Sequence, residues 1–207
     1  MKKICYIVCY GEKFNMPEFI ENNGLVIAVD GGYKYLIENG IKPNLVVGDF
    51  DSLNYVPENE NIIKLPAIKD ETDTFYAIKS GISEGCNEFH IYCGTGGRFE
   101  HTFANIQCLC YLAKNNYKAI LYDKDTIMTA IHNCELNVAN GTGYLSVFSL
   151  SDKSIGVSIE NMKYLLNDYT MTNSFPIGVN NEFIGKPSKI KVTSGTLLIR
   201  LPITAKI

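Results

Sequence analysis

Leu45-Val46-Val47-Gly48-Asp49-Phe50-Asp51-Ser52 is an apolar run that ends in two carboxylates one residue apart. Such a run is typical of a buried strand in a parallel sheet, with the acids at the carboxyl end of the strand. In open α/β sheets this end of the strands is where ligands bind. A second acidic segment, Lys69-Asp70-Glu71-Thr72-Asp73, follows the next apolar run. We therefore expect an α/β sheet whose carboxyl edge carries both groups of acids.

Up to about residue 125, short apolar runs alternate with helical patterns. This alternation predicts a parallel sheet with crossover helices. The strands are expected at Ile4–Tyr10, Leu25–Val29, Leu45–Val47, Ile62–Leu65, Glu88–Cys93 and Lys118–Tyr122, and the helices at Met16–Asn22, Tyr33–Asn39, Asp73–Ser83 and His101–Lys114.

From about Asp125 the helical periodicity fades, and short apolar strands alternate with turn residues. The dipeptides Asn140-Gly141 and Ser194-Gly195 are typical of β-hairpin turns. The sequence thus predicts two closely packed domains: an α/β, three-layer domain with a parallel sheet over residues 1–124, and a smaller all-β, sandwich-like domain over residues 125–207. In the second domain the strands are expected at Thr126–His132, Gly143–Ser149, Lys189–Thr193 and Thr196–Leu201.

Charge and composition narrow the classes of partner. The formal net charge of −3 argues against nucleic acid, because binding a phosphate backbone needs a basic footprint. No apolar stretch approaches the ~20 residues of a membrane span, and the short apolar run after Lys2-Lys3 is interpreted as the first strand rather than a signal peptide. The seven cysteines form no Cys-x-x-Cys pair, so we expect buried thiols in a protein of the reducing cytoplasm.

Asp49 and Asp51 are close enough in sequence for both carboxylates to meet on one cation. Two neighbouring carboxylates repel each other unless a proton or a cation compensates. Mg²⁺ is the natural partner, because it takes oxygen ligands and usually shares its shell with water and phosphate oxygens. The competing interpretation is an Asx-type turn, in which each Asp accepts a hydrogen bond from a backbone amide.

The second acidic segment is expected at the same edge of the sheet. Thr72 is placed to cap a helix that begins at Asp73, and this role alone would explain both residues. Together with Lys69 and Asp70, however, the segment offers a cation, two acids and a hydroxyl. It follows a predicted strand and is expected at the same edge of the sheet as Asp49. This combination favours a shared metal–phosphate site.

Glycine-rich segments follow two other predicted strands. In Gly94-Thr95-Gly96-Gly97-Arg98 the glycines would let backbone amides approach an anion, and Arg98 offers a planar fork for phosphate oxygens. The spacing matches neither a Walker loop nor the dinucleotide fingerprint, so an ordinary strand-to-helix connection is the alternative. Asp30-Gly31-Gly32 could receive a base or a ribose, or could form only a tight turn.

Four of these segments together resemble the signature blocks of the thiamine pyrophosphokinase family. In the family's order they are Val29-Asp30-Gly31-Gly32, Gly48-Asp49-Phe50-Asp51-Ser52 after Pro43, Lys69-Asp70-Glu71-Thr72-Asp73, and Gly96-Gly97-Arg98-Phe99-Glu100-His101. The resemblance covers nearly the whole chain, because an α/β catalytic half followed by a β-rich half is also the family's architecture. It implies transfer of the diphosphate of ATP to the hydroxyl of thiamine, giving thiamine diphosphate and AMP.

The resemblance also implies roles for individual residues. Asp49, Asp51 and Asp73 match the acids that hold Mg²⁺, and with Arg98 they are the candidate catalytic residues. The resemblance implies a homodimer with thiamine bound at the subunit interface, and Asn181 matches a residue near that pocket. The candidates for ATP binding are Asp30, Gly31, Gly32, Ser52, Lys69, Asp70, Thr72 and Arg98.

One residue departs from the family's pattern, and two other functions stay open. Glu100 stands where the family usually has Asp, so the carboxylate is one methylene further from the backbone. The first alternative is another Mg²⁺-dependent phosphoryl or diphosphoryl transferase, such as a nucleotide hydrolase or a pterin pyrophosphokinase-like enzyme. The second is a thiamine or nucleotide sensor that binds without turnover, which the change at Glu100 would suit.

Overall fold

The computed structural model of the protein describes residues 3–14, 24–50, 55, 57, 61–66, 70–139 and 141–207. Its internal contacts divide the chain into two compact units. Unit 1 comprises Met1–Cys108 and Tyr117–Asp123, and unit 2 comprises Leu109–Asn116 and Lys124–Ile207. The predicted helix Met16–Asn22 lies outside the described residues.

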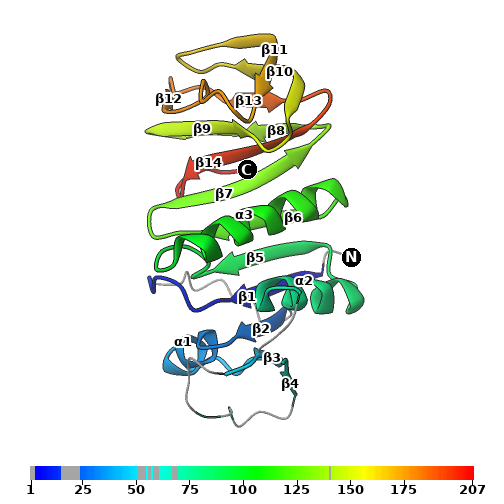
Figure 1. Cartoon of the computed structure of the whole chain (residues 1–207). Helices are drawn as coiled ribbons and strands as arrows, with labels where there is room; N and C mark the ends of the chain where they lie inside the picture. The colour runs from blue at the N-terminus through cyan, green and yellow to red at the C-terminus, as the bar shows by residue number, and fades with distance from the viewer. Residues whose placement is uncertain are drawn as a thin grey trace. The chain divides into compact units, whose positions relative to one another are not determined.

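Unit 1 is built on a parallel sheet with the strand order β6-β5-β1-β2-β3-β4 (Figure 1). Helices connect β2 to β3, β4 to β5 and β5 to β6, because parallel strands need a crossover connection. The parallel sheet with crossover helices is therefore confirmed. The strands are β1 (Ile4–Val8), β2 (Leu25–Val29), β3 (Leu45–Gly48), β4 (Ile62–Lys64), β5 (Glu88–Tyr92) and β6 (Lys118–Tyr122), and the helices are α1 (Gly32–Glu38), α2 (Asp73–Ser83) and α3 (Phe99–Lys114).

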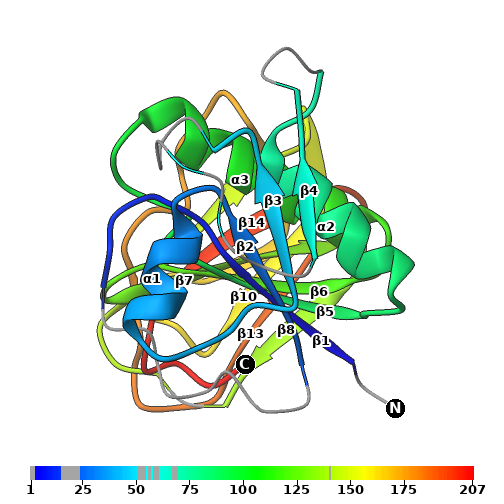
Figure 2. The same ribbon diagram turned by 90° about the horizontal axis from the view of Figure 1, so that it is seen from below.

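Helices α1 and α2 cover opposite faces of this sheet (Figure 2). Leu36 of α1 belongs to the same buried cluster as Tyr6 of β1. Gly81 of α2 lies against Cys5, the neighbouring residue of β1, because a Cβ on Gly81 would come within 2.8 Å of the Cys5 sulfur. Successive side chains of a strand point to opposite faces, so the two helices must lie on different sides. Both faces being covered explains why β1 is apolar throughout.

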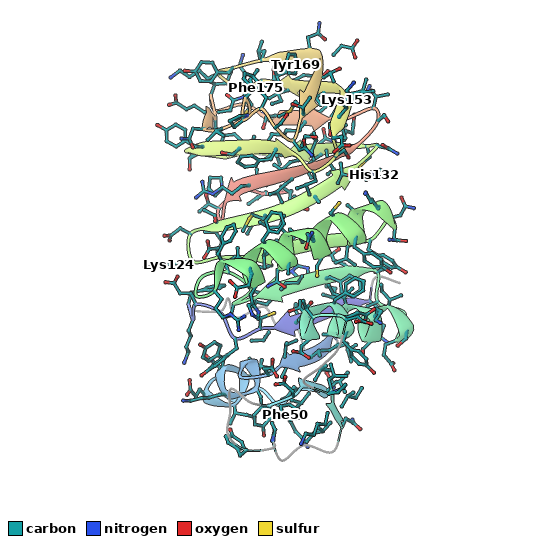
Figure 3. The ribbon with its side chains drawn as sticks, viewed as in Figure 1. Phe50, Lys124, His132, Lys153, Tyr169 and Phe175 are labelled. Atoms are coloured by element: carbon teal, nitrogen blue, oxygen red, sulfur yellow. The ribbon has the colours of Figure 1, made fainter. Side chains whose placement is uncertain are left out.

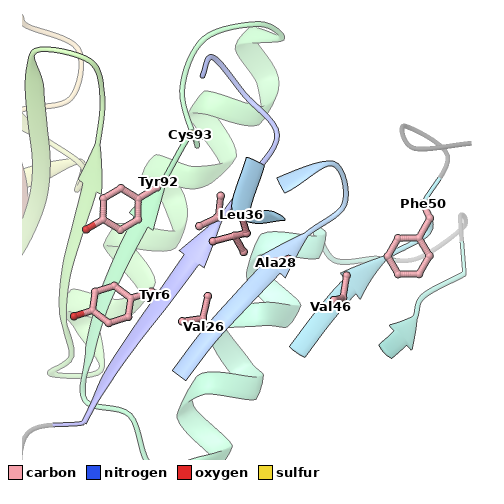
Figure 4. Packing of buried hydrophobic residues seen from close by; sticks show 9 residues of the cluster. Tyr6, Val26, Ala28, Leu36, Val46, Phe50, Tyr92 and Cys93 are labelled. Carbon is pink, nitrogen blue, oxygen red and sulfur yellow. The ribbon is translucent and has the colours of Figure 1, made fainter. Parts of the chain in front are cut away.

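The buried cluster on the α1 face extends along the sheet from β5 to β3. It includes Phe50 just after β3 (Figures 3 and 4) and Tyr92 at the end of β5 (Figure 4), both almost completely buried. Complete burial of one large apolar side chain contributes about 1.5–3 kcal/mol. The cluster therefore fixes the carboxyl ends of the strands, where the acids of the sequence motifs lie.

The strands of unit 2 form two antiparallel sheets. One has the order β12-β9-β14-β7 and the other the order β11-β10-β13-β8. Both sheets contribute completely buried residues, such as Val147 from the first and Ile190 from the second. The predicted all-β character is confirmed. The strands are β7 (Thr126–His132), β8 (Glu135–Val138), β9 (Tyr144–Ser149), β10 (Lys153–Glu160), β11 (Leu166–Thr172), β12 (Asn181–Glu182), β13 (Ser188–Lys191) and β14 (Thr196–Pro202).

The two hairpin predictions for unit 2 are wrong. Ser194-Gly195 connects β13 to β14, and these strands belong to different sheets. Gly195 has a φ of +118°, and a Cβ there would lie 2.8 Å from the Cα of Ser154, so the glycine permits a crossing from one sheet to the other. Asn140 lies outside the described residues, but the strands on either side of it, β8 and β9, are likewise in different sheets.

The cysteines form no disulfide: all seven are free thiols, and five of them are buried. Cys5, Cys9, Cys93 and Cys108, which lie among apolar residues in the sequence, are buried, and Cys110, in a similar context, is half-buried. Within the described part of the chain, no helix combines the length and the apolar character needed to cross a membrane.

Candidate active site

A cavity of about 610 Å³ opens at the carboxyl edge of the unit 1 sheet. Its walls are formed by the residues that follow β1, β2 and β5, by the first turn of α2 and by the first two turns of α3. Asp30, Thr72, Asp73 and Arg98 line it together, although they are far apart in the sequence. The carboxyl ends of parallel strands meet at one edge, which explains why these segments converge.

The backbone is strained at three strand ends around this edge. Asp30 after β2, Phe50 after β3 and Cys93 after β5 all have positive φ values, of 46°, 64° and 53°. Such conformations are uncommon for residues other than glycine and are maintained only when the surrounding packing enforces them. Here the buried cluster that contains Phe50 and Cys93 supplies that packing.

The Asp30 side chain is held against the end of β3. Its Oδ1 accepts a hydrogen bond from the Phe50 amide at 3.4 Å. A Cβ on Gly48 would lie 1.9 Å from the same oxygen, so the carboxylate occupies the space that the Cβ of any other residue at position 48 would need. The glycine in the Gly48-Asp49-Phe50 segment is therefore required for Asp30 to reach this position.

Negative charge accumulates around Asp30. Burial raises the pKa of its carboxyl group to about 7, and the nearby acids Asp73 and Asp49 act in the same direction. The Phe50 amide partly offsets these effects. The carboxylates of Asp30 after β2, Asp49 after β3 and Asp73 at the start of α2 are thus within electrostatic range of one another.

The described residues do not by themselves form a complete metal site. Among them, no group of three or more His, Cys, Asp or Glu side chains is arranged to hold a metal ion. Asp51, the third acid of the predicted Mg²⁺ set, lies outside the described residues, as do Ser52 and Lys69. The carboxylates that are described nevertheless have the oxygen chemistry that Mg²⁺ prefers.

The helix that presents Asp73 begins as the sequence predicts. Thr72 is the N-cap of α2, and its Oγ1 accepts a hydrogen bond from the Phe75 amide at 3.2 Å. Asp73 lies in the first turn, where the helix dipole favours an anion. The next residue, Thr74, ties the start of the helix to the end of β1, because its Oγ1 lies 3.4 Å from the buried sulfur of Cys9.

Replacing Thr72 with Ala should lower the free energy of unfolding by about 1 kcal/mol, because the Phe75 amide loses its acceptor. Thr72→Ser keeps a hydroxyl and should lose less than half of this amount. Urea unfolding followed by circular dichroism measures both values. Equal stability of the Ala variant and the unmodified protein would show that the cap contributes nothing.

Two hydrogen bonds anchor the start of the glycine-rich loop between β5 and α3. Asn105 of α3 donates a hydrogen bond from Nδ2 to the carbonyl oxygen of Gly94 at 2.7 Å, and Thr95 Oγ1 donates to Asp123 Oδ1 at 3.0 Å. Directly after these anchored residues, Gly96 and Gly97 both adopt positive φ, at 73° and 60°. A backbone of this shape can direct consecutive amides toward an anion.

Arg98 follows the loop and reaches the cavity wall. Its Nε donates to Oε1 of Glu100 at 2.6 Å, and both side chains are exposed to solvent. The pKa of the Glu100 carboxyl is lowered, first by a hydrogen bond from its own backbone amide and then by Arg98. Glu100, where the family usually has Asp, thus contacts a predicted phosphate-binding residue.

Several predicted site residues have other surroundings. Gly31, Gly32, Asp49 and Asp70 are described but do not line the cavity. A Cβ on Gly32 would lie 2.0 Å from the Val8 carbonyl oxygen, so this glycine allows α1 to approach β1 closely. Asp70 is exposed.

Asn181 in unit 2 is buried, with 5% of its surface exposed. Its Oδ1 accepts from the Tyr164 amide at 2.9 Å, and its Nδ2 donates to the Tyr164 carbonyl oxygen at 2.6 Å. Both ends of the side-chain amide therefore hold the backbone of Tyr164, whose own side chain is exposed.

Some residues of the cavity wall belong to none of the sequence motifs. Tyr10 and Glu12 follow β1, and Asn105 lies in the second turn of α3. The rule that ligands bind at carboxyl ends of strands applies to β1 as well as to β3, so this signal could have identified Tyr10 and Glu12. Asn105 had no comparable signal.

The fold and the site define an α/β protein with an acidic, glycine-rich cavity at the carboxyl edge of a parallel sheet, followed by an all-β unit. Two family models match the chain. Residues 16–121 match the catalytic domain of thiamin pyrophosphokinase, and residues 132–197 match the vitamin B1 binding domain of thiamin pyrophosphokinase. The chain belongs to the thiamin pyrophosphokinase family, a family of diphosphokinases.

Individual relatives agree with this assignment. A thiamine pyrophosphokinase of Bacillus subtilis is 27% identical over 95% of this chain and 97% of its own length. The crystal structure of a Bacillus subtilis thiamine pyrophosphokinase superposes with a TM-score of 0.86 at 26% identity, covering 98% of this chain and all of that one. The enzyme of Candida albicans shares the fold at 15% identity, with a TM-score of 0.79 over 98% of this chain and 89% of its own.

Proposed function

We propose that the protein transfers the diphosphate group of ATP to the hydroxyl of thiamine, yielding thiamine diphosphate and AMP in a Mg²⁺-dependent reaction. The main support for this reaction is that Asp30, Asp73 and Arg98 line the same cavity beside a glycine-rich loop. Acids suit a metal–phosphate complex, and a guanidinium with exposed backbone amides suits the phosphates themselves.

Arg98 and the glycine-rich loop are the proposed phosphate-binding elements. The ion pair between Arg98 and Glu100 is exposed, and exposed pairs contribute little to stability. Arg98 can therefore exchange its carboxylate partner for a phosphate oxygen at low cost. Gly96 and Gly97 lie directly before it, so their amides and the guanidinium can bind one phosphate chain. Charge on the transferred or departing phosphates would be stabilised by these preorganised donors.

Asp49, Asp51 and Asp73 are the proposed ligands of Mg²⁺. Their carboxylates match the hard-oxygen preference of this ion, and the charge that gathers around Asp30 is of the sign that a cation relieves. When bound, Mg²⁺ supplies neutralisation of the phosphate oxygens. Asp30, Gly31, Gly32, Ser52, Lys69, Asp70, Thr72 and Arg98 remain the candidates for contact with ATP or for support of its binding loops.

The thiamine half of the site is proposed to involve unit 2. Asn181 keeps its place as a candidate, in a positioning role, since its amide already holds the backbone of the exposed Tyr164. We also propose a homodimer with thiamine at the subunit interface. Light scattering of the purified chain, giving a mass twice that of one subunit, would support the dimer, and a monomeric mass would exclude it.

An assay of the purified full chain tests the reaction. With ATP, Mg²⁺ and thiamine we expect AMP and thiamine diphosphate in equal amounts, and no ADP. Omitting thiamine, or adding EDTA in excess of Mg²⁺, should abolish AMP release. Release of ADP would indicate another phosphoryl transferase. Tight ATP binding without thiamine-dependent AMP would indicate a sensor.

A further inference from the structure

We propose that Tyr10 is the aromatic wall against which the adenine ring of the nucleotide packs. This inference rests on the proposed function, because it takes ATP as the co-substrate. It adds a specificity-determining residue that lies outside all four sequence motifs. Tyr10 lies two residues after the end of β1, at the edge of the sheet where the acids converge.

Tyr10 combines a place in the cavity wall with a partly accessible ring. It lines the cavity, and 43% of its surface is exposed. A partly exposed aromatic ring in a cavity wall offers a flat apolar surface on which a base can stack. Among the described residues that line the cavity, Tyr10 is the only tyrosine, phenylalanine or tryptophan, and the chain contains no tryptophan at all.

The Tyr10 ring is held by contacts with Gly31 and with the ring of Tyr35. A Cβ on Gly31 would lie 2.4 to 2.5 Å from three atoms of the Tyr10 ring, so the ring rests directly on the glycine backbone. The Tyr35 ring contacts it with centroids 5.1 Å apart and planes inclined by 44°. Gly31, which is also a candidate for contact with the nucleotide, makes room for the Tyr10 ring.

The neighbour Tyr35 is itself fixed in place. Its hydroxyl donates a hydrogen bond to the Gly11 carbonyl oxygen at 3.2 Å. Lys13 lies over its ring, 5.3 Å from the centroid, and forms an ion pair with Glu38 of α1. The side chain that supports Tyr10 therefore cannot turn away freely, and the wall is preorganised before any ligand arrives.

Tyr10 is also connected through the backbone to the glycine-rich loop. The Gly11 amide donates to the Cys93 carbonyl oxygen at 2.7 Å, and the Glu12 amide donates to that of Thr95 at 2.8 Å. The aromatic wall and the proposed phosphate-binding loop are thus two parts of one hydrogen-bonded assembly. A nucleotide needs both elements: amides and a cation for its phosphates, and a flat apolar surface for its base.

A base packed on an aromatic side chain gains about 1–3 kcal/mol. This magnitude sets the expected effect of removing the ring. Tyr10→Leu keeps apolar volume without the ring, and should weaken binding of Mg·ATP about tenfold. Tyr10→Phe keeps the ring and should bind Mg·ATP within twofold of the unmodified protein.

The experiment is isothermal titration calorimetry of the full chain with two probes, Mg·ATP and Mg·tripolyphosphate. Tripolyphosphate has the phosphates without the base, so Tyr10→Leu should leave its affinity within twofold. Tyr169→Leu is the matched control: the same substitution at a tyrosine of β11 with 36% exposure, outside the cavity wall (Figure 3). It should change neither affinity.

Three results would overturn the inference. The first is an unchanged affinity of Tyr10→Leu for Mg·ATP. The second is an equal loss of affinity for Mg·tripolyphosphate, which would indicate a structural role. The third is a raised KM for thiamine with an unchanged KM for ATP, which would place the thiamine ring against Tyr10 instead. Failure of the proposed function is seen separately, as absence of thiamine-dependent AMP in the unmodified protein. The calorimetric comparison does not depend on turnover.

Discussion

Replacing Asp73 with Asn is expected to lower the rate of thiamine-dependent AMP formation at least a hundredfold while the protein stays folded. Asp73 lines the cavity from the first turn of α2 and interacts with Asp30. Asn has nearly the same shape, so packing is preserved, but the charge proposed to hold Mg²⁺ is lost. Loss of the anion at the helix N-terminus should lower the free energy of unfolding by only about 0.3–1 kcal/mol.

Three measurements separate these effects. Steady-state kinetics gives the turnover, a Mg²⁺ titration gives the half-saturating concentration of the ion, and urea unfolding gives the stability. Glu71→Gln is the matched control, because Glu71 carries the same charge two residues earlier but forms a surface ion pair with Lys79. Its turnover should stay within twofold. Turnover of the Asp73 variant within fivefold of the unmodified protein would refute the metal assignment.

The parallel sheet was predictable because most of its strands are short apolar runs that end close to a glycine or an acid; β4, which is followed by Leu65-Pro66, is the exception. The boundaries of β2, β6 and α2 agree with the predicted ranges to the residue. Elsewhere the ends differ by one or two residues: β1 stops at Val8, before the predicted Tyr10, and α3 begins at Phe99, before the predicted His101. These differences arise where the chain turns into the cavity wall, and tertiary contacts decide the conformation there.

The acids of the site were predictable as a group, but their supporting geometry was not. Residue type and spacing indicate that Asp30 and Asp73 face one edge. Spacing gives no signal for the positive φ of Phe50 and Cys93, because those conformations depend on burial in a cluster drawn from several strands. The role of Gly48 is a contact with a residue eighteen positions away, which no local pattern reveals.

Unit 2 was less predictable because its strands are irregular. Strands β10 and β11 were missed, and their pairing has shifts of register on both sides of Val157. Gly156 adopts a φ of +70° inside β10, and Asp168 adopts +49° inside β11. Bulges of this kind interrupt the alternation of apolar and polar residues on which the prediction of a strand depends.

The second large effect is expected for Gly48→Ala. The new methyl group would lie 1.9 Å from Oδ1 of Asp30 and 3.2 Å from its Cα, so the carboxylate must rotate out of its position. We expect turnover to fall about a hundredfold, because the acid cluster loses one of its members. Stability should fall by only about 1–3 kcal/mol, since the overlap is with a side chain that can move.

A double-mutant cycle with Asp30→Ala shows whether the effect acts through Asp30. Asp30→Ala removes the two nearest contacts of the methyl group at residue 48, with Oδ1 and Cγ, and leaves the Cα at 3.2 Å, a contact that a small shift relieves. Gly48→Ala should then cost less than threefold in turnover beyond Asp30→Ala alone, because two changes that remove the same interaction are not additive. Additive losses in the double variant would mean that Gly48 acts independently of Asp30, and that the close approach of the two residues has no part in the reaction.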